Sequence, residues 1–251
     1  MLENRVIPCL QLLDNSLVKT VKFRKYEYIG DPLNTCRIFN ELEVDEMLLL
    51  DIRATVSKKP IDFNYLQALA NECFMPLAYG GGIKTVEDAR QLFRIGFEKI
   101  VINSAFYRNI NLVKQIAETF GTQSIIASVD VKKDFIGTYH AYSNSGHKKE
   151  RGEVIGWMQE LQKEGVGEIL LTDIAREGTW SGFDIPFIRK VTQQLKIPVI
   201  VHGGAGCAND IEDAVNCGGA SAVALGNMVV FQQKDMGVLI NYKKDYDFKG
   251  R

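Results

Sequence analysis

Two glycine-rich segments offer the first chemistry in this chain. Gly81 and Gly82 lie in "YGGGIKT", and Gly203 and Gly204 lie in "HGGAGCAND"; each segment follows a short apolar run and precedes a helical pattern. Glycine lets backbone N–H groups approach an anion without a Cβ in the way, and the start of a helix adds positive potential. One such pair is typical of a simple turn, but two in the same context predict a pair of phosphate sites.

Small polar residues supply neighbours for both predicted sites. Asn103 and Ser104 in "VINSA" lie near the first, and Gly226 and Asn227 in "ALGNM" lie near the second. Gly178 in "REGTWSG" also falls beside the second site. The predicted ligand is long and carries a phosphate at each end, and a ligand with one phosphate is the alternative.

A carboxylate at the end of a buried strand is a candidate general acid or base. Asp130 ends the apolar run "SIIASVD", whereas the matching place at the end of the first run holds Gln11. An amide forms hydrogen bonds but does not exchange a proton near neutral pH. A mechanism with two carboxylates is therefore broken, or its second group comes from elsewhere. Asp51 and Asp173 also follow strands, either as ligand contacts or as organisers of loops.

The elements that must position these residues are short apolar runs alternating with amphipathic stretches such as 85–96 and 154–165. This alternation predicts βαβ units and a parallel sheet covered on both faces. Eight strands close a (β/α)₈ (TIM) barrel, whose functional residues lie at the carboxyl ends of the strands. The eight runs are 5–10, 46–52, 75–80, 99–104, 124–130, 168–174, 197–203 and 221–227.

The chain repeats itself. "EVDEMLLLDI" is answered by "GVGEILLTDI", so that Glu46 recurs as Glu168 and Asp51 as Asp173, at an offset of 122 residues. We interpret this as a duplication of half-barrels of about 1–122 and 123–251 within one domain, residues 1–251. Each half alone would leave open sheet edges, which argues against an open doubly-wound sheet.

Composition excludes several classes of protein. The 251 residues carry a net charge of −1, from 30 Lys and Arg against 31 Asp and Glu, which argues against a broad nucleic-acid or membrane surface. The chain has no apolar run of about 18 residues and no signal-peptide pattern at its start. Five scattered cysteines without a CxxC motif favour reduced thiols in a cytoplasmic protein, with no metal and no cofactor.

The segments "VIPCL", "LLLDI", "GGGIKTVEDA", "INSA", "GEILLTDIAREGTWSG" and "GGAG" together resemble the HisF family over nearly the whole chain. HisF is the synthase (cyclase) subunit of imidazole glycerol phosphate synthase, in histidine biosynthesis. The resemblance implies a heterodimer with a HisH-like glutaminase, whose ammonia passes through the barrel. There it reacts with a bisphosphorylated ribulosyl-carboxamide ribotide, giving imidazole glycerol phosphate and an aminoimidazole carboxamide ribotide.

The resemblance also assigns residues. It makes Asp130 catalytic and places Gln11 where the family has a second catalytic aspartate. A ring of charges at the amino-terminal face, where ammonia would enter, matches Arg5, Glu46, Lys99 and Glu168, and a purely structural plug of ion pairs is the alternative. The predicted substrate and phosphate contacts are Lys19, Asp51, Gly81, Gly82, Asn103, Ser104, Thr172, Glu177, Gly178, Gly203, Gly204, Gly226 and Asn227.

Three departures from the family pattern leave further functions open. Gln11 and Glu177 stand where the family has aspartate, and His202 stands where it usually has serine. Such a chain is similar to HisF-like paralogues of surface-polysaccharide gene clusters, which are thought to carry ammonia for acetamidino sugars. A HisA-type sugar-phosphate isomerase and a non-catalytic scaffold that relays ammonia are also compatible with the pattern.

Overall fold

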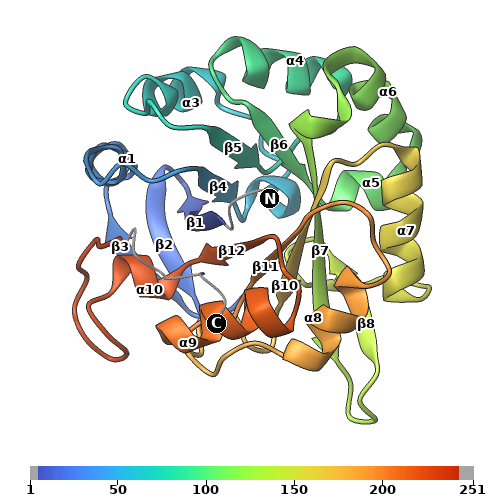
Figure 1. The fold of residues 1–251 in the computed structure, drawn as a ribbon. Helices are drawn as coiled ribbons and strands as arrows, with labels where there is room; N and C mark the ends of the chain where they lie inside the picture. The colour runs from blue at the N-terminus through green and yellow to red at the C-terminus, as the bar shows by residue number, and fades with distance from the viewer. Residues whose placement is uncertain (1–4, 243–251) are drawn as a thin grey trace.

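The computed structural model describes residues 5–242, and its centre is a closed barrel of eight parallel strands (Figure 1). Closure is visible in the pairing, because Arg5 on the first strand lies opposite Ala222 on the last. The strands are β1 (Arg5–Leu13), β4 (Met47–Asp51), β5 (Leu77–Gly80), β6 (Lys99–Ile102), β7 (Ile125–Lys133), β10 (Glu168–Asp173), β11 (Val199–His202) and β12 (Ala222–Leu225). The predicted TIM barrel is confirmed. The predicted domain also includes residues 1–4 and 243–251, which lie outside the described residues.

Helices surround the barrel (Figure 1). Their starts follow local chemistry: Asp31 and Asp184 cap helices that have proline in the first turn, and Thr85 with Asp88 forms a capping box. The helices are α1 (Pro32–Glu41), α2 (Ala54–Ser57), α3 (Phe63–Ala70), α4 (Val86–Arg94), α5 (Ser104–Arg108), α6 (Asn111–Phe120), α7 (Val154–Glu164), α8 (Ile185–Thr192), α9 (Ala208–Glu212) and α10 (Asn227–Val230), with a 3₁₀ turn at Thr122–Ser124 and a π turn at Asp213–Cys217. None of the described helices is long and apolar enough to cross a bilayer.

The core has two parts. A large cluster fills the space between the strands and the helices. A second cluster fills the inside of the barrel and is apolar throughout: Ile7, Cys9, Leu48, Ala78, Val101, Ile126, Leu170, Ile200, Ala222 and Ala224, with Leu50 against it. The barrel is therefore a packed interior with polar groups at its two ends.

Two hairpins extend equivalent strands at the carboxyl end of the barrel. β2 (Ser16–Thr20) and β3 (Tyr26–Gly30) continue from β1, and β8 (Tyr139–Ser143) continues from β7, followed by β9 (Lys148–Lys149). The sequence pattern did not predict these strands. The β7–β8 hairpin projects well beyond the barrel (Figure 1).

The sheet register shows where the proposed repeat shifts. Gln11 lies opposite Leu50 and Asp130 opposite Thr172, and Leu50 and Thr172 are 122 residues apart. Gln11 and Asp130 are thus equivalent at an offset of 119. Asn103 (φ −116°, ψ −83°) and Gly226 (φ −98°, ψ −87°) follow the last strand of each half and share an unusual backbone conformation. They are therefore equivalent residues, at an offset of 123. Loops of different length absorb these differences.

Candidate active site

A cavity opens at the carboxyl ends of the strands and brings together predicted residues from both halves of the chain. It is lined by Gln11, Asp51, Gly81, Gly82, Asn103, Ser104, Asp130 and Thr172, together with Thr20, Phe23, Tyr26, Ser128, Ser145, His147 and His202. The first predicted phosphate site, Gly81 and Gly82 with Asn103 and Ser104, therefore shares one cavity with the candidate acid–base residue. We call these four residues the first cup.

Asp130 is buried at the base of this cavity. Its Oδ2 accepts a hydrogen bond from Asn103 Nδ2 at 3.0 Å, and its Oδ1 accepts one from Ser128 Oγ at 3.0 Å. Burial raises the pKa of Asp130 to about 7, against the opposing effect of the Ser128 hydrogen bond, and the negative charge of Glu177 adds to the rise. A carboxyl group with this pKa can both release and accept a proton near neutral pH.

Gln11 belongs to a buried polar cluster with Thr20 and Glu177. Gln11 Nε2 donates to Glu177 Oε1 at 3.3 Å, and Thr20 Oγ1 lies 2.7 Å from the same oxygen and 3.2 Å from Gln11 Oε1. The other Glu177 oxygen accepts the backbone N–H of Phe23 at 3.1 Å. Glu177 thus ties the β2–β3 loop to the loop after β10, and its carboxylate is committed to these donors.

The second predicted phosphate site is a smaller cavity across the mouth, lined by Lys19, Glu177, Gly178, His202, Gly203, Gly204, Ala205, Ala224, Gly226 and Asn227. We call it the second cup. Lys19 is buried in it and donates to the carbonyl oxygen of Cys9 at 3.3 Å. A Cβ at Gly226 would overlap Lys19 Nζ, so glycine makes room for the ammonium. Burial lowers the pKa of Lys19.

The histidine before the second Gly-Gly pair is uncharged. Burial, followed by the positive charge of Lys19, lowers the pKa of His202 to about 3. Its Nδ1 lies 3.3 Å from Thr172 Oγ1. His202 lines both the main cavity and the second cup, so its neutral ring separates the two sites.

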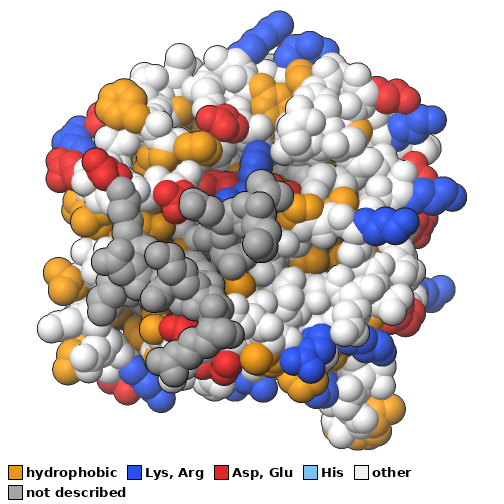
Figure 2. Space-filling model, viewed as in Figure 1, with side chains coloured by type: hydrophobic (Ala, Val, Ile, Leu, Met, Phe, Trp, Pro, Cys, Tyr) orange, Lys and Arg blue, Asp and Glu red, His pale blue; other side chains and the backbone are white. Residues whose placement is uncertain are grey.

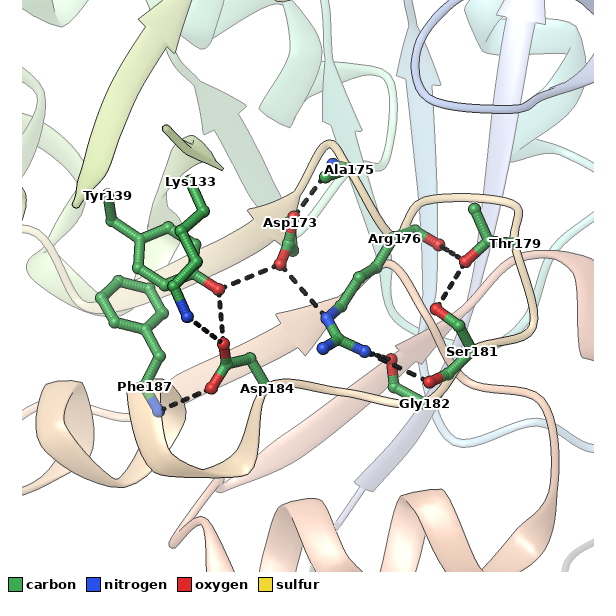
Figure 3. A network of polar contacts seen from close by, with 10 residues as sticks. All are labelled: Lys133, Tyr139, Asp173, Ala175, Arg176, Thr179, Ser181, Gly182, Asp184 and Phe187. Carbon is green, nitrogen blue, oxygen red and sulfur yellow. Dashed lines mark hydrogen bonds and ion pairs between the residues drawn. The ribbon is translucent and has the colours of Figure 1, made fainter. Parts of the chain in front are cut away.

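A polar network holds the loop that carries Glu177 and Gly178 (Figure 3). Asp173 accepts the N–H of Ala175 at 2.9 Å and the hydroxyl of Tyr139 at 3.2 Å, and its carboxylate lies 3.6 Å from Arg176. Arg176 also donates to the carbonyl oxygens of Ser181 and Gly182. Asp51 does the same in the first half, since it accepts the N–H groups of Arg53 at 2.9 Å and Ala54 at 2.8 Å. Both aspartates therefore organise loops, while Asp51 also lines the cavity.

The glycine runs lie farther from the helices than expected. After Gly82, α4 begins only at Val86. The N–H groups of Lys84 and Thr85 donate to the Asp88 carboxylate, and the N–H of Asp88 donates to Thr85 Oγ1. Each glycine segment is followed by a helix, as predicted, and a capping residue, Thr85 or Cys207, lies between the glycines and that helix. The short helices α5 and α10, which start at Ser104 and Asn227 and have no side-chain cap, lie at the cups instead.

The predicted charged ring forms at the opposite end of the barrel. Arg5 contacts Glu46 at 2.5 Å and Glu168 at 2.9 Å, and Lys99 contacts the same two carboxylates at 2.9 Å each. Figure 2 shows basic and acidic side chains together near the middle of this face. Burial opposes ionisation of Glu168, but Arg5 and Lys99 outweigh it and leave the pKa below its ordinary value. The four residues make a closed ring of ion pairs.

Several residues of the site were not among those predicted. Thr20, Ser128 and His202 line the cavity or bond its carboxylates, and each is a common residue in an apolar strand without a local motif. Because side chains alternate between the two faces of a strand, the position of Ser128 two residues before Asp130 would have placed both on the same face of β7. Asn227, a predicted contact of the second site, donates to the carbonyl oxygen of Gly178 at 3.1 Å, and its own Oδ1 is buried with no partner among the described residues.

Comparison with known proteins decides the family. The model of the family described as "Histidine biosynthesis protein" matches residues 5–235. The chain belongs to this family. The hisF2 protein of Pseudomonas aeruginosa is 44% identical over 242 residues, which are 96% of each chain. The hisF3 protein of Vibrio vulnificus is 42% identical over 243 residues, 96% of this chain and 94% of its own. The HisF subunit of imidazole glycerol phosphate synthase from Streptococcus gordonii is 38% identical over 211 residues, 84% of each chain.

These relatives confirm the predicted membership of the HisF-like group. They include both proteins named as HisF subunits and proteins with numbered hisF names. The names of these relatives support a general role like that of a HisF subunit, and the residues at the mouth must decide the chemistry.

Proposed function

We propose that this chain is a HisF-type synthase subunit that uses ammonia delivered by a partner glutaminase. The observation that carries the proposal is the closed ring of Arg5, Glu46, Lys99 and Glu168 at one end of an apolar barrel interior, with Asp130 at the other. Neutral ammonia crosses an apolar interior far more easily than ammonium, since a charge is costly to desolvate. The ring then controls access to the interior, and a HisH-like glutaminase docks over it as the second subunit of a heterodimer.

The two cups hold the phosphates of the substrate. Backbone groups of Gly81 and Gly82 with Ser104 bind one phosphate, and Gly203 and Gly204 with the Lys19 ammonium bind the other. This arrangement suspends the middle of a bisphosphorylated substrate over Asp130. Ammonia that leaves the barrel interior meets the substrate there.

Asp130 supplies the acid–base chemistry. With a pKa of about 7 it takes a proton from the attacking nitrogen and returns it to a leaving group. Gln11, on the other side of the mouth, can only orient a substrate hydroxyl or carbonyl. Glu177 does not replace it, because its two oxygens accept hydrogen bonds from Thr20, Gln11 and Phe23.

A paralogous amidation is the second candidate, and Gln11 is the observation that favours it. If Asp130 is the only carboxylate of the equivalent pair Gln11 and Asp130, the barrel serves mainly to carry ammonia to an acceptor, such as the sugar of an acetamidino-sugar pathway. A HisA-type isomerase is disfavoured, because isomerisation needs neither ammonia nor the ring.

The test is turnover of the bisphosphorylated ribotide by the purified chain, with ammonium salts and, separately, with glutamine and the partner glutaminase. Turnover similar to that of a two-aspartate relative supports the cyclase. Turnover that appears only when Gln11→Asp is combined with Glu177→Asp, whose carboxylate lies 3.3 Å from the Gln11 amide, supports the amidation role for the natural chain. A chain that neither binds a glutaminase nor responds to ammonia contradicts both.

A further inference from the structure

A further cavity of about 310 Å³, distinct from the second cup, lies beside the active-site cavity at the carboxyl end of the barrel. The two cavities share Phe23, Ser145 and His147 as a common wall. Its other lining residues are Lys22, Arg24, Lys132, Tyr142, Gly146, Ile174 and Ala175. Neither the two cups nor the acid–base residue belongs to it.

The charge of this cavity is one-sided. Lys22, Arg24 and Lys132 line it, and none of the described Asp or Glu residues does. Within residues 5–242, the side chains of these three cations make no ion pair or hydrogen bond. Their neighbours differ, since Lys133 pairs with Asp184 at 3.2 Å and Lys148 pairs with Glu150 at 3.0 Å. Three cations left without anions around one cavity create a local positive potential on a chain of net charge −1.

The walls of the cavity are aromatic and fixed. Phe23 and Tyr142 line it along with Ile174, which offers an apolar surface for a ring. Lys22 and Phe23 have positive φ angles (57° and 58°), a conformation held because the N–H groups of both residues donate to Glu177. Across from them, a Cβ on Gly146 would lie 3.1 Å from the Phe23 ring. The two loops therefore pack closely and preform the site.

We infer that this cavity binds the phosphate or diphosphate group of a second, ring-bearing ligand, with the anion at Lys22, Arg24 and Lys132 and the ring against Phe23 and Tyr142. Lysine and arginine bind phosphate oxygens through charge-assisted hydrogen bonds, and aromatic faces accept a sugar or base. The inference does not depend on ammonia use. It adds a third anion site to the two cups, for a phosphorylated sugar or a nucleotide.

Titration calorimetry with the full chain tests this site. The probes are pyrophosphate and uridine diphosphate, and the variants alter only this cavity, so the cups contribute equally to the wild-type and variant titrations. The triple variant Lys22→Ala, Arg24→Ala, Lys132→Ala should weaken binding of both probes by roughly tenfold or more, because three charge-assisted contacts are lost. The matched control is Lys149→Ala, an exposed lysine on β9 that does not line the cavity.

The outcomes separate the possible sources of the anion. Tighter binding of uridine diphosphate than of pyrophosphate, lost in Tyr142→Ala, supports a ring seated against Tyr142, whereas equal binding of the two would show that the ring contributes nothing and would overturn the inference of a ring-bearing ligand. Equal losses in the triple variant and in Lys149→Ala would mean that only general surface charge acts, and would overturn the inference. So would probe binding that the triple variant leaves unchanged. The substituted side chains are exposed, and a circular dichroism spectrum matching wild type verifies that the variant folds.

Discussion

Gln11 and Asp130 occupy equivalent places on opposite sides of the barrel mouth, one opposite Leu50 and the other opposite Thr172 in the sheet. The amide of Gln11 stands next to the buried carboxylate of Glu177, at 3.3 Å. A carboxylate at position 11 would lie against that charge, and two adjacent carboxylates raise each other's pKa. The identity of residue 11 is therefore linked to that of residue 177.

This linkage predicts how cyclase activity can be restored. Gln11→Asp alone should raise ammonia-dependent turnover of the bisphosphate only slightly, since the new carboxyl lies beside Glu177 and stays protonated. In the double variant Gln11→Asp, Glu177→Asp, the shorter side chain at position 177 moves its carboxylate away from residue 11. Turnover should then rise by about 10²-fold, the low end of general acid–base effects. Steady-state rates with ammonium measure both. Gln11→Asn is the control without a new acid, and equal rates in the single and double variants would contradict the linkage.

The raised pKa of Asp130 predicts a pH dependence of stability. Folding moves this pKa from an ordinary value near 3.8 to about 7, so between these pH values the folded chain holds a proton that the unfolded chain has lost. Stability therefore falls as pH rises through this window. From pH 5 to pH 8 the free energy of unfolding should fall by about 2 to 3 kcal/mol more in wild type than in Asp130→Asn. Urea unfolding at the two pH values measures the difference.

The Asp130→Asn variant also separates the proposed roles. It should abolish the cyclase reaction of the purified chain with ammonium. A complex that only relays ammonia would keep forming its product. Parallel pH curves for wild type and Asp130→Asn would show that Asp130 titrates normally, and would remove the acid–base argument.

The strands of the barrel could be predicted from the sequence, because Leu, Ile and Val runs are buried on both faces and leave a local signal. The β2–β3 hairpin could not. Its segment "LVKTVKFRKYEY" is rich in charged residues and resembles a basic loop. Only the pairing of β2 with the end of β1, and of β3 with β2, makes strands of its two ends. The same limit applies within the site. Glu177 meets Thr20 across 157 residues, a contact that depends on barrel closure and leaves no trace in local spacing.

The charged ring predicts a difference between two sources of ammonia. Lys99→Met leaves Glu46 and Glu168 with Arg5 alone, so one carboxylate charge in a largely buried ring is no longer balanced. We expect glutamine-dependent turnover of the complex to fall by about tenfold. Turnover with external ammonium, which can reach the mouth from solvent, should fall by less than about twofold. The ratio of the two rates is the measurement.

The control for the ring is Lys114→Met, the same substitution on helix α6, where the ammonium lies 3.9 Å from Glu118 in an exposed pair. It should leave both rates unchanged, as exposed pairs contribute little. If Lys99→Met lowers the two rates equally, the ring acts as a structural plug and not as a control of ammonia passage.

The contact between Gly226 and Lys19 predicts an asymmetry between the cups. Gly226→Ala places a Cβ where the Lys19 ammonium now lies, while the backbone at φ −98° tolerates alanine. The flexible lysine moves out of the second cup, so phosphate affinity there should fall by roughly tenfold while the first cup is unaffected. Calorimetry with inorganic phosphate should then show weaker binding at one of the two cups. Gly237→Ala is the control, since a Cβ there meets nothing within 4 Å. Unchanged affinity at both sites would show that Lys19 is not a phosphate ligand.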